Sequence, residues 1–205
     1  MRHVGLTGNI ASGKSAVAVL LAQHGAEIID ADLLAREAVA PGTEGLARVV
    51  AHFGPSVLLP DGSLDRAALR HLVFSDGAAR DALNRIVHPA VALLRDARLA
   101  DARARHLPLV VSDVPLLFEV GLEHAFDAII LVDAPPALRL ARLVHDRGLT
   151  PSDAQAMMDA QWPAERKRAG ATWVIDNDGS RAQLAERVDK VWRALQSAAS
   201  PTPSE

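Results

Sequence analysis

The chain carries, close to its first residue, the segment Gly8-Asn9-Ile10-Ala11-Ser12-Gly13-Lys14-Ser15. This segment matches G-x-x-x-x-G-K-[ST], the P-loop, whose backbone amides cradle phosphate groups. Its surroundings also fit the motif. Apolar residues 4–7 precede it like a strand, and residues 16–22 follow it like a helix that stops at Gly25, a good C-terminal cap. The alternative is a glycine-rich turn that matches by chance, but the strand and helix favour a nucleoside triphosphate site.

Each fixed position of this segment has a physical reason. Gly8 and Gly13 let the backbone turn tightly and approach phosphate oxygens without a Cβ in the way. Successive amides and the helix N-terminus form an anion site, Lys14 adds a positive charge for the phosphates, and the Ser15 hydroxyl suits Mg²⁺. The residues that we expect to bind ATP are Gly8, Asn9, Ala11, Ser12, Gly13, Lys14, Ser15, Ala16 and, from its spacing alone, Arg139.

The composition is that of a water-soluble globular protein, with 49% hydrophobic and 23% charged residues in 205. A net charge of -3 provides no general basic field, so nucleic acid and anionic membranes are not expected partners. The chain has no cysteine, which excludes disulfides and thiolate metal sites. We expect no signal sequence, because the first predicted strand begins almost at Met1, and no membrane span. A cytoplasmic monomer or weak homo-oligomer is the corresponding expectation.

Five short apolar runs predict strands, and most of them are continuous rather than alternating, as expected when both faces of a sheet are covered. These runs are residues 4–7, 27–30, 109–112, 128–133 and 172–176. Helical patterns lie between them, so we predict an α/β protein of three layers around a five-stranded parallel sheet. A closing helix over residues 183–196 would place Leu184, Val188, Val191 and Leu195 on one face.

Two long helical insertions interrupt the predicted strand order. The first should contain helices over residues 33–39, 44–53, 65–74 and 78–105, the last interrupted by Pro89, with a turn at Pro60-Asp61-Gly62. We therefore divide the chain into a P-loop core, a helical acceptor-binding insertion, a helical lid and a disordered tail. Their respective residues are 1–32 with 107–135 and 170–197, then 33–106, 136–169 and 198–205.

Carboxylates follow two of the predicted strands, where ligands of open parallel sheets bind. Asp30 and Asp32 close the second strand, and one of them could accept a proton from an acceptor hydroxyl. Asp32 could equally be the N-cap of a helix starting at Leu33. Asp113 ends an apolar strand in the Walker B manner and could hold Mg²⁺, although many strands end in Asp as part of a turn.

Basic residues gather in the second insertion. Arg139 and Arg142 are three positions apart and share a helix face, Arg147 follows them, and residues 166–168 are all basic. They could line a lid that brings guanidinium groups onto transferring phosphates, or form an ordinary solvated face. His88, before Pro89, could mark a simple kink or aim an imidazole at a substrate.

Several segments taken in order resemble the dephospho-CoA kinase family over nearly the whole chain. Besides the P-loop, the segments similar to the family are Asp30-Ala31-Asp32-Leu33-Leu34-Ala35-Arg36, His88-Pro89, Asp113-Val114-Pro115-Leu116-Leu117-Phe118-Glu119 and Val174-Ile175-Asp176-Asn177. The resemblance implies transfer of the ATP γ-phosphate to the ribose 3′-hydroxyl of dephospho-CoA on a nucleoside-monophosphate-kinase-like core. Catalytic roles are then expected for Asp32, Lys14 and Arg142, and Mg²⁺ binding for Ser15 and Asp113. The same resemblance implies contacts with the substrate by Asp32, Arg36, His88, Pro115 and Leu116.

The chain departs from the family pattern at several positions. The loop usually reads G-G-I-G-S-G, whereas this chain has Asn9 and Ala11. Asn9 tolerates left-handed backbone, and Ala11 predicts that its own position needs no positive φ. The second arginine of the lid is displaced by one, to Arg147.

Two other classes of protein also carry a P-loop. A nucleoside or nucleotide kinase would use another acceptor, and the Asp30–Asp32 and Asp113–Glu119 segments argue against it. A GTPase-like switch would usually carry an N-K-x-D segment, which is absent from this chain.

Overall fold

The computed structural model describes residues 1–197, apart from the side chain of Ser75. The predicted tail, residues 198–205, lies outside the described residues. A five-stranded sheet has the order β2-β3-β1-β4-β5, and the pairs β1–β3, β1–β4 and β4–β5 run parallel. The strands are β1 (Arg2–Gly8), β2 (Glu27–Asp30), β3 (Leu109–Asp113), β4 (Ala128–Asp133) and β5 (Trp173–Asp176). The prediction of an α/β fold with a five-stranded parallel sheet is confirmed.

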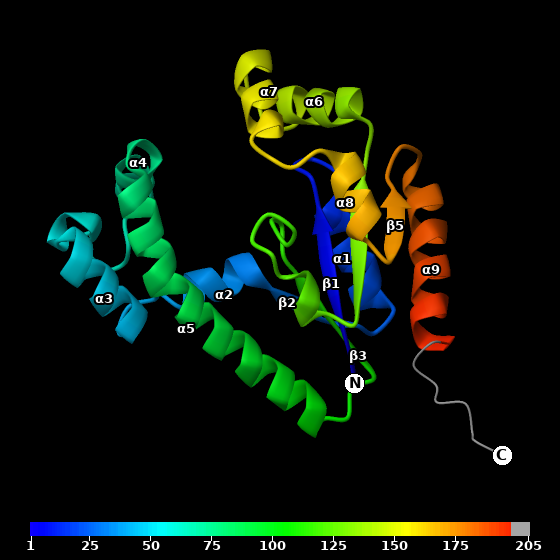
Figure 1. Cartoon of the computed structure of the whole chain (residues 1–205), viewed down its shortest axis with the longest axis horizontal. Helices are drawn as coiled ribbons and strands as arrows, with labels where there is room; N and C mark the ends of the chain where they lie inside the picture. The colour runs from blue at the N-terminus through cyan, green and yellow to red at the C-terminus, as the bar shows by residue number, and fades with distance from the viewer. Residues whose placement is uncertain (198–205) are drawn as a thin grey trace. The chain divides into compact units, whose positions relative to one another are not determined.

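Side chains of the central strands alternate between two apolar layers. Ala128, Ile130 and Val132 of β4 belong to a core formed with α1 (Lys14–Gln23) and α9 (Arg181–Ser197), whereas Ile129 packs with Leu117 and Phe118 on the other face. Successive residues of a strand point to opposite faces, so one continuous apolar run supplies both layers. Figure 1 shows α9 beside β5 at one edge of this sheet. The apolar stripe predicted for the last helix is confirmed, because its four members are buried.

Within the described residues, the chain divides into two compact units, residues 1–29 with 102–197, and residues 30–101. The second unit has a core of its own, made by Val39, Leu46, Val49, Val57, Leu64 and Leu69. Its helices are α2 (Ala31–Glu37), α3 (Glu44–Phe53), α4 (Arg66–Ser75) and the greater part of α5 (Gly77–Ala104), with the 3-10 turn η1 (Pro55–Val57). The turn at Pro60-Asp61-Gly62 is confirmed, since Gly62 has a φ of 79° and the Ser63 amide donates to Asp61 Oδ1.

Two local predictions for this second unit were wrong. The long helix α5 is not interrupted, because it continues through Pro89 as a single element. Proline removes one amide donor and crowds the preceding turn, but neither effect ends the helix here. The first helix begins at Ala31 rather than Leu33, and its N-cap is Asp30, whose Oδ1 accepts from the amides of Asp32 and Leu33 at 2.8 and 3.1 Å. Asp32 is therefore not the cap.

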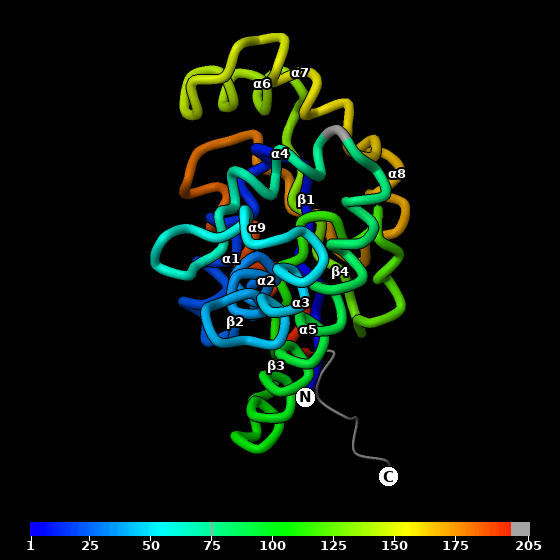
Figure 2. Tube along the Cα trace, turned by 90° about the vertical axis from the view of Figure 1, so that its left-hand side faces the viewer, coloured from blue at the N-terminus to red at the C-terminus, as the bar shows by residue number. Residues whose placement is uncertain are grey.

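The first unit also contains the second helical insertion. It comprises α6 (Pro136–His145), α7 (Pro151–Asp159) and α8 (Ala164–Gly170), and the short 3-10 turn η2 (Glu123–Ala125) precedes β4. Figures 1 and 2 both place α6 beside α7, and Leu143, Ala154 and Met158 form the apolar contact between them. None of the helices in the described part of the chain has the length and hydropathy of a membrane span.

Candidate active site

The P-loop joins the end of β1 at Gly8 to the first residue of α1, Lys14. Gly13 has a φ of 95°, and a Cβ there would overlap the side-chain amide nitrogen of Asn177, so this position requires glycine. The prediction for Ala11 was wrong, because this residue has a φ of 59°. An alanine in the left-handed region costs roughly 1–2 kcal/mol, so neighbouring contacts must hold it there.

Those contacts come from residues far along the chain. Arg142 on α6 donates from Nη1 to the carbonyls of Ala11 and Ser12, at 3.0 and 3.3 Å, and from Nη2 to the carbonyl of Asn177 at 3.1 Å. Asn177, which follows β5, donates its own Nδ2 to the Ser12 carbonyl at 2.7 Å. Carbonyls of the loop are thus turned toward Arg142 and Asn177.

The backbone amides at the start of α1 differ from these carbonyls in having no partner in the described part of the protein. Among the residues that the structure describes, none accepts a hydrogen bond from the amides of Gly13, Lys14 and Ser15. Unpaired amides at a helix N-terminus, combined with the helix dipole, bind anions. The P-loop therefore presents free amides that can hold an anion, and Ser15 and Ala16 are exposed in the first turn of α1.

The Lys14 ammonium forms an ion pair with Asp113 at the end of β3. Asp113 is only 5% exposed, and its strand pairs with β1 in the register Leu6–Asp113. This register brings the end of the Walker B strand alongside the P-loop, as the sequence predicts. Each group offsets the charge of the other, which allows both to lie in a partly buried site.

The other sequence-predicted residues of the first unit are Arg139, Pro115 and Leu116. Arg139 does not join Arg142 at the loop. It is buried and donates Nε to the Ala134 carbonyl at 3.1 Å. Burial lowers the pKa of Arg139, and the negative charges of Asp133 and Glu165 partly offset that effect. The Pro115 carbonyl accepts from the Thr7 hydroxyl at 3.1 Å, which holds the segment after β3 against β1, while Leu116 is exposed.

Three predicted substrate residues belong to the second unit. Asp32 lies in the first turn of α2, Arg36 in its last turn and His88 on α5, and all three are exposed. Because Asp30 caps the helix, the Asp32 carboxylate is not needed for capping. Capping therefore does not explain this residue, whose remaining local effect is a favourable interaction with the dipole of α2.

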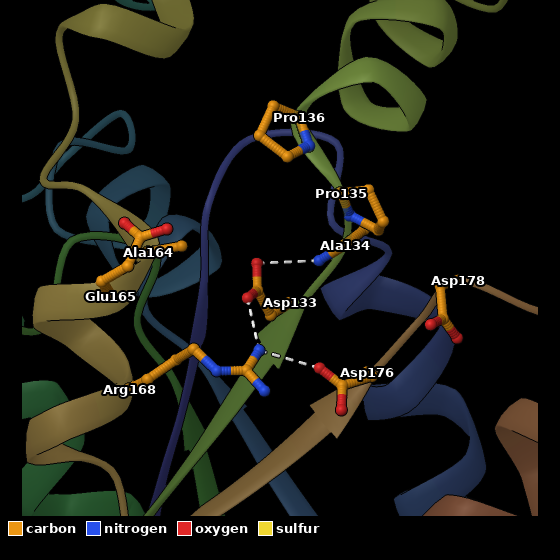
Figure 3. Close-up of a pocket in the computed structure, with 9 residues that line it drawn as sticks. All are labelled: Asp133, Ala134, Pro135, Pro136, Ala164, Glu165, Arg168, Asp176 and Asp178. Atoms are coloured by element: carbon orange, nitrogen blue, oxygen red, sulfur yellow. Dashed lines mark hydrogen bonds and ion pairs between the residues drawn. The ribbon is translucent and has the colours of Figure 1, made fainter.

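A pocket lies beyond the ends of β4 and β5 and was not predicted from the sequence (Figure 3). Its lining residues are Asp133, Ala134, Pro135, Pro136, Ala164, Glu165, Arg168, Asp176 and Asp178. Arg168 bridges Asp133 and Asp176 at 2.6 and 2.8 Å, and these hydrogen bonds, first to Asp176, raise its pKa. Asn177 follows Asp176 directly, so the bridge fixes the end of β5 from which Asn177 reaches the P-loop.

A largely buried ion pair joins α8 to the segment after β3. Lys167 on α8 is 0% exposed although it lies in a run of basic residues, and its Nζ is 2.6 Å from Glu119 Oε1. The same oxygen accepts from the Trp162 amide at 3.1 Å. Solvent-exposed arginines flank Lys167 on both sides, so the sequence pattern alone could not identify it as buried.

We predict that Lys167→Met lowers the free energy of unfolding by about 3–5 kcal/mol, because it leaves the Glu119 carboxylate buried without a counter-charge. The double variant Lys167→Met with Glu119→Gln should recover much of this loss, since it removes the charge and keeps an acceptor for Trp162. Urea unfolding measures both. Arg98→Met, which breaks an exposed pair with Glu37, is the control and should change stability by less than about 1 kcal/mol. Equal losses in the single and double variants would contradict the prediction.

Comparison with known proteins agrees with this geometry. A family model described as dephospho-CoA kinase matches residues 2–183. A dephospho-CoA kinase from Streptomyces avermitilis is 50% identical over 199 residues, covering 95% of this chain and 94% of the relative. A crystal structure of a Thermus thermophilus protein superposes with a TM-score of 0.83 at 39% identity, covering 94% of this chain and 96% of that one. The fold is also that of a dephospho-CoA kinase from Campylobacter jejuni, with a TM-score of 0.73 at 24% identity and coverages of 97% and 98%. The chain therefore belongs to the dephospho-CoA kinase family.

Proposed function

We propose that this chain transfers the γ-phosphoryl group of ATP to the ribose 3′-hydroxyl of dephospho-CoA, which gives CoA and ADP in the last step of CoA synthesis. The observation that carries this proposal is a P-loop with free amides and a paired Lys14 inside a chain that matches the family from residue 2 to residue 183. A cytoplasmic location and a monomeric or weakly oligomeric state stay predictions.

The loop supplies the ATP site. Free amides at Gly13, Lys14 and Ser15 suit the β-phosphate. The Lys14 ammonium can leave Asp113 and bind phosphate oxygens when ATP is present. Because Arg142 and Asn177 hold the loop carbonyls away, the amides are fixed before ATP arrives. Such preorganisation favours stabilisation of charge in the transition state. The Ser12 hydroxyl is buried and has no partner within residues 1–197, so it is available as a further donor.

The donor set fits Mg²⁺. Ser15 offers a hydroxyl and Asp113 a carboxylate, and magnesium usually takes one or two protein oxygens together with substrate phosphates and water. Residues 1–197 contain no cluster of three or more His, Cys, Asp or Glu side chains that could hold a metal without a nucleotide. When bound there, the ion neutralises charge on the β- and γ-phosphates.

Asp32 is the group that we assign to the acceptor hydroxyl. Its carboxylate accepts the proton as the bond from O3′ to the γ-phosphorus forms and the bond from that phosphorus to the β-phosphate oxygen breaks. Arg142 supports the loop directly. To stabilise the equatorial oxygens of the transferring phosphoryl group, its guanidinium must release the carbonyls of Ala11 and Ser12 and bind those oxygens instead.

An acceptor screen tests the proposed function. We expect the purified chain to release ADP from ATP–Mg²⁺ with dephospho-CoA, and mass spectrometry should show a product heavier by one phosphoryl group. AMP, CMP and nucleosides should give turnover at least about 10³-fold lower, because an acceptor site that pairs with specific polar groups rejects analogues that lack them. Comparable turnover with any of these acceptors would assign the chain to another kinase reaction. Slow hydrolysis with no phosphorylated acceptor would favour a switch.

A further inference from the structure

The segment between α7 and α8, Gln161-Trp162, contacts the P-loop from its outer side. Oε1 of Gln161 accepts from the Ile10 amide at 2.7 Å, and the carbonyl of Trp162 accepts from Asn9 Nδ2 at 3.1 Å. Asn9 is 5% exposed, so its bond is largely removed from water. We call residues 161 and 162 the strap, because both of its bonds reach the same turn of the loop.

The strap is itself held on two sides. The buried Lys167–Glu119 pair receives the Trp162 amide, and the Arg166 guanidinium lies 3.3 Å above the centre of the Trp162 ring. These contacts come from α8 and from the segment after β3. The strap is therefore fixed independently of the P-loop, and it can serve as a support for the loop.

Apolar packing reinforces the same connection. Ile10 and Ala11 pack against the cluster of Leu143, Ala154 and Met158 between α6 and α7. Ala11 has the unfavourable φ of 59°, and such a conformation persists only where the surroundings over-determine it. Arg142 holds the Ala11 carbonyl, and Gln161 holds the amide of the preceding residue. The backbone on both sides of the strained position is thus fixed by side chains of the second insertion.

We propose that Gln161 is a positioning residue for the nucleotide, acting through the Asn9–Ile10 peptide. The proposal rests on the proposed kinase function. The Ile10 amide is directed to the strap and is not offered to phosphate, so its acceptor determines the orientation of this peptide. The peptides that follow present the free amides of Gly13, Lys14 and Ser15. Without Gln161 the turn can rotate, and ATP must then order it on binding.

Asn9 adds a second bond that depends on this chain's own residue. The family pattern usually has glycine at this position, and glycine has no side chain to reach the Trp162 carbonyl. Oδ1 of Asn9 is buried without a partner in the described part of the chain. The asparagine thus contributes one bond and carries the cost of one unpaired oxygen, so its removal should have a smaller effect than removal of Gln161.

Gln161→Leu tests the proposal. We expect KM for ATP to rise about tenfold, because a partly buried amide loses its acceptor. Because this weakens the ground state and the transition state alike, kcat should stay within about twofold. KM for dephospho-CoA should not change. Calorimetric titration with ATP–Mg²⁺ should give the same factor in Kd. Gln155→Leu is the matched control and should leave all constants unchanged. That side chain is exposed on α7, and within residues 1–197 it is hydrogen-bonded only to Asp159.

Asn9→Gly provides a second variant, for which we expect a rise of about threefold in KM for ATP. Two results would overturn the proposal: a fall in kcat with KM and Kd for ATP unchanged, which would indicate general destabilisation, or no change of any constant in Gln161→Leu. If the native chain bound ATP but did not phosphorylate dephospho-CoA, the proposed function would fail. The calorimetric Kd values would still decide the role of the strap.

Discussion

Lys14→Ala is expected to lower kcat/KM for transfer to dephospho-CoA by about 10²–10³-fold while the chain remains folded. Lys14 is the one charged side chain between Gly8 and Ser15, and stabilisation of charge in the transition state is usually the largest single contribution to catalysis. The substitution also has a second unfavourable effect, on the charge balance of the site. Asp113, which is 5% exposed, loses the cation that now offsets its charge, so a buried carboxylate would face the incoming triphosphate.

Steady-state kinetics with ATP as the varied substrate measures this loss, and circular dichroism establishes that the fold is kept. Lys190→Ala, at an exposed position of α9, is the control for removing one lysine charge. Lys14→Arg should recover only part of the activity, because a planar guanidinium does not reproduce a compact point charge. Activity within about tenfold of the native chain would mean that the Lys14 ammonium does not serve the reaction.

Much of the sheet could be predicted because its strands are encoded locally. The bounds of β2 and β4 agree with the predicted strands, since each is a short apolar run that ends in Asp. The same locality made the P-loop recognisable, because its glycines, Lys14 and Ser15 are contiguous. Asp113 could be assigned to the site for a related reason: the carboxyl ends of parallel strands meet at one edge of the sheet.

Features that depend on distant residues could not be predicted. The conformation of Ala11 follows from Arg142, which is 131 positions away, and the support of Ile10 follows from Gln161, which is 151 away. Lys167 shares its run with solvent-exposed arginines, and only the carboxylate of Glu119 explains its burial. Asn177 belonged to a quoted family segment, yet nothing in its own neighbourhood indicated a bond to the Ser12 carbonyl.

Asp32→Asn is expected to lower kcat by about 10²–10⁴-fold, the range that positioned acid–base groups contribute. Asparagine keeps the size of the side chain but cannot take the proton of the 3′-hydroxyl. We expect this variant to lose activity without a matching loss in the free energy of unfolding. Asp30 caps α2 through its own carboxylate, and Asp32 contributes only its amide to that cap. KM for ATP should be unchanged, because the P-loop does not include Asp32.

The neighbouring Asp30 makes a matched comparison possible. Asp30→Ala removes the N-cap and should lower the free energy of unfolding by about 1 kcal/mol. Asp32→Asn should leave stability unchanged and reduce turnover with dephospho-CoA. Phosphoryl transfer has a loose transition state in which alignment can matter more than proton removal. If kcat of a folded Asp32→Asn variant fell by less than about tenfold, alignment would be the main contribution of this side chain, and the general-base role would be wrong.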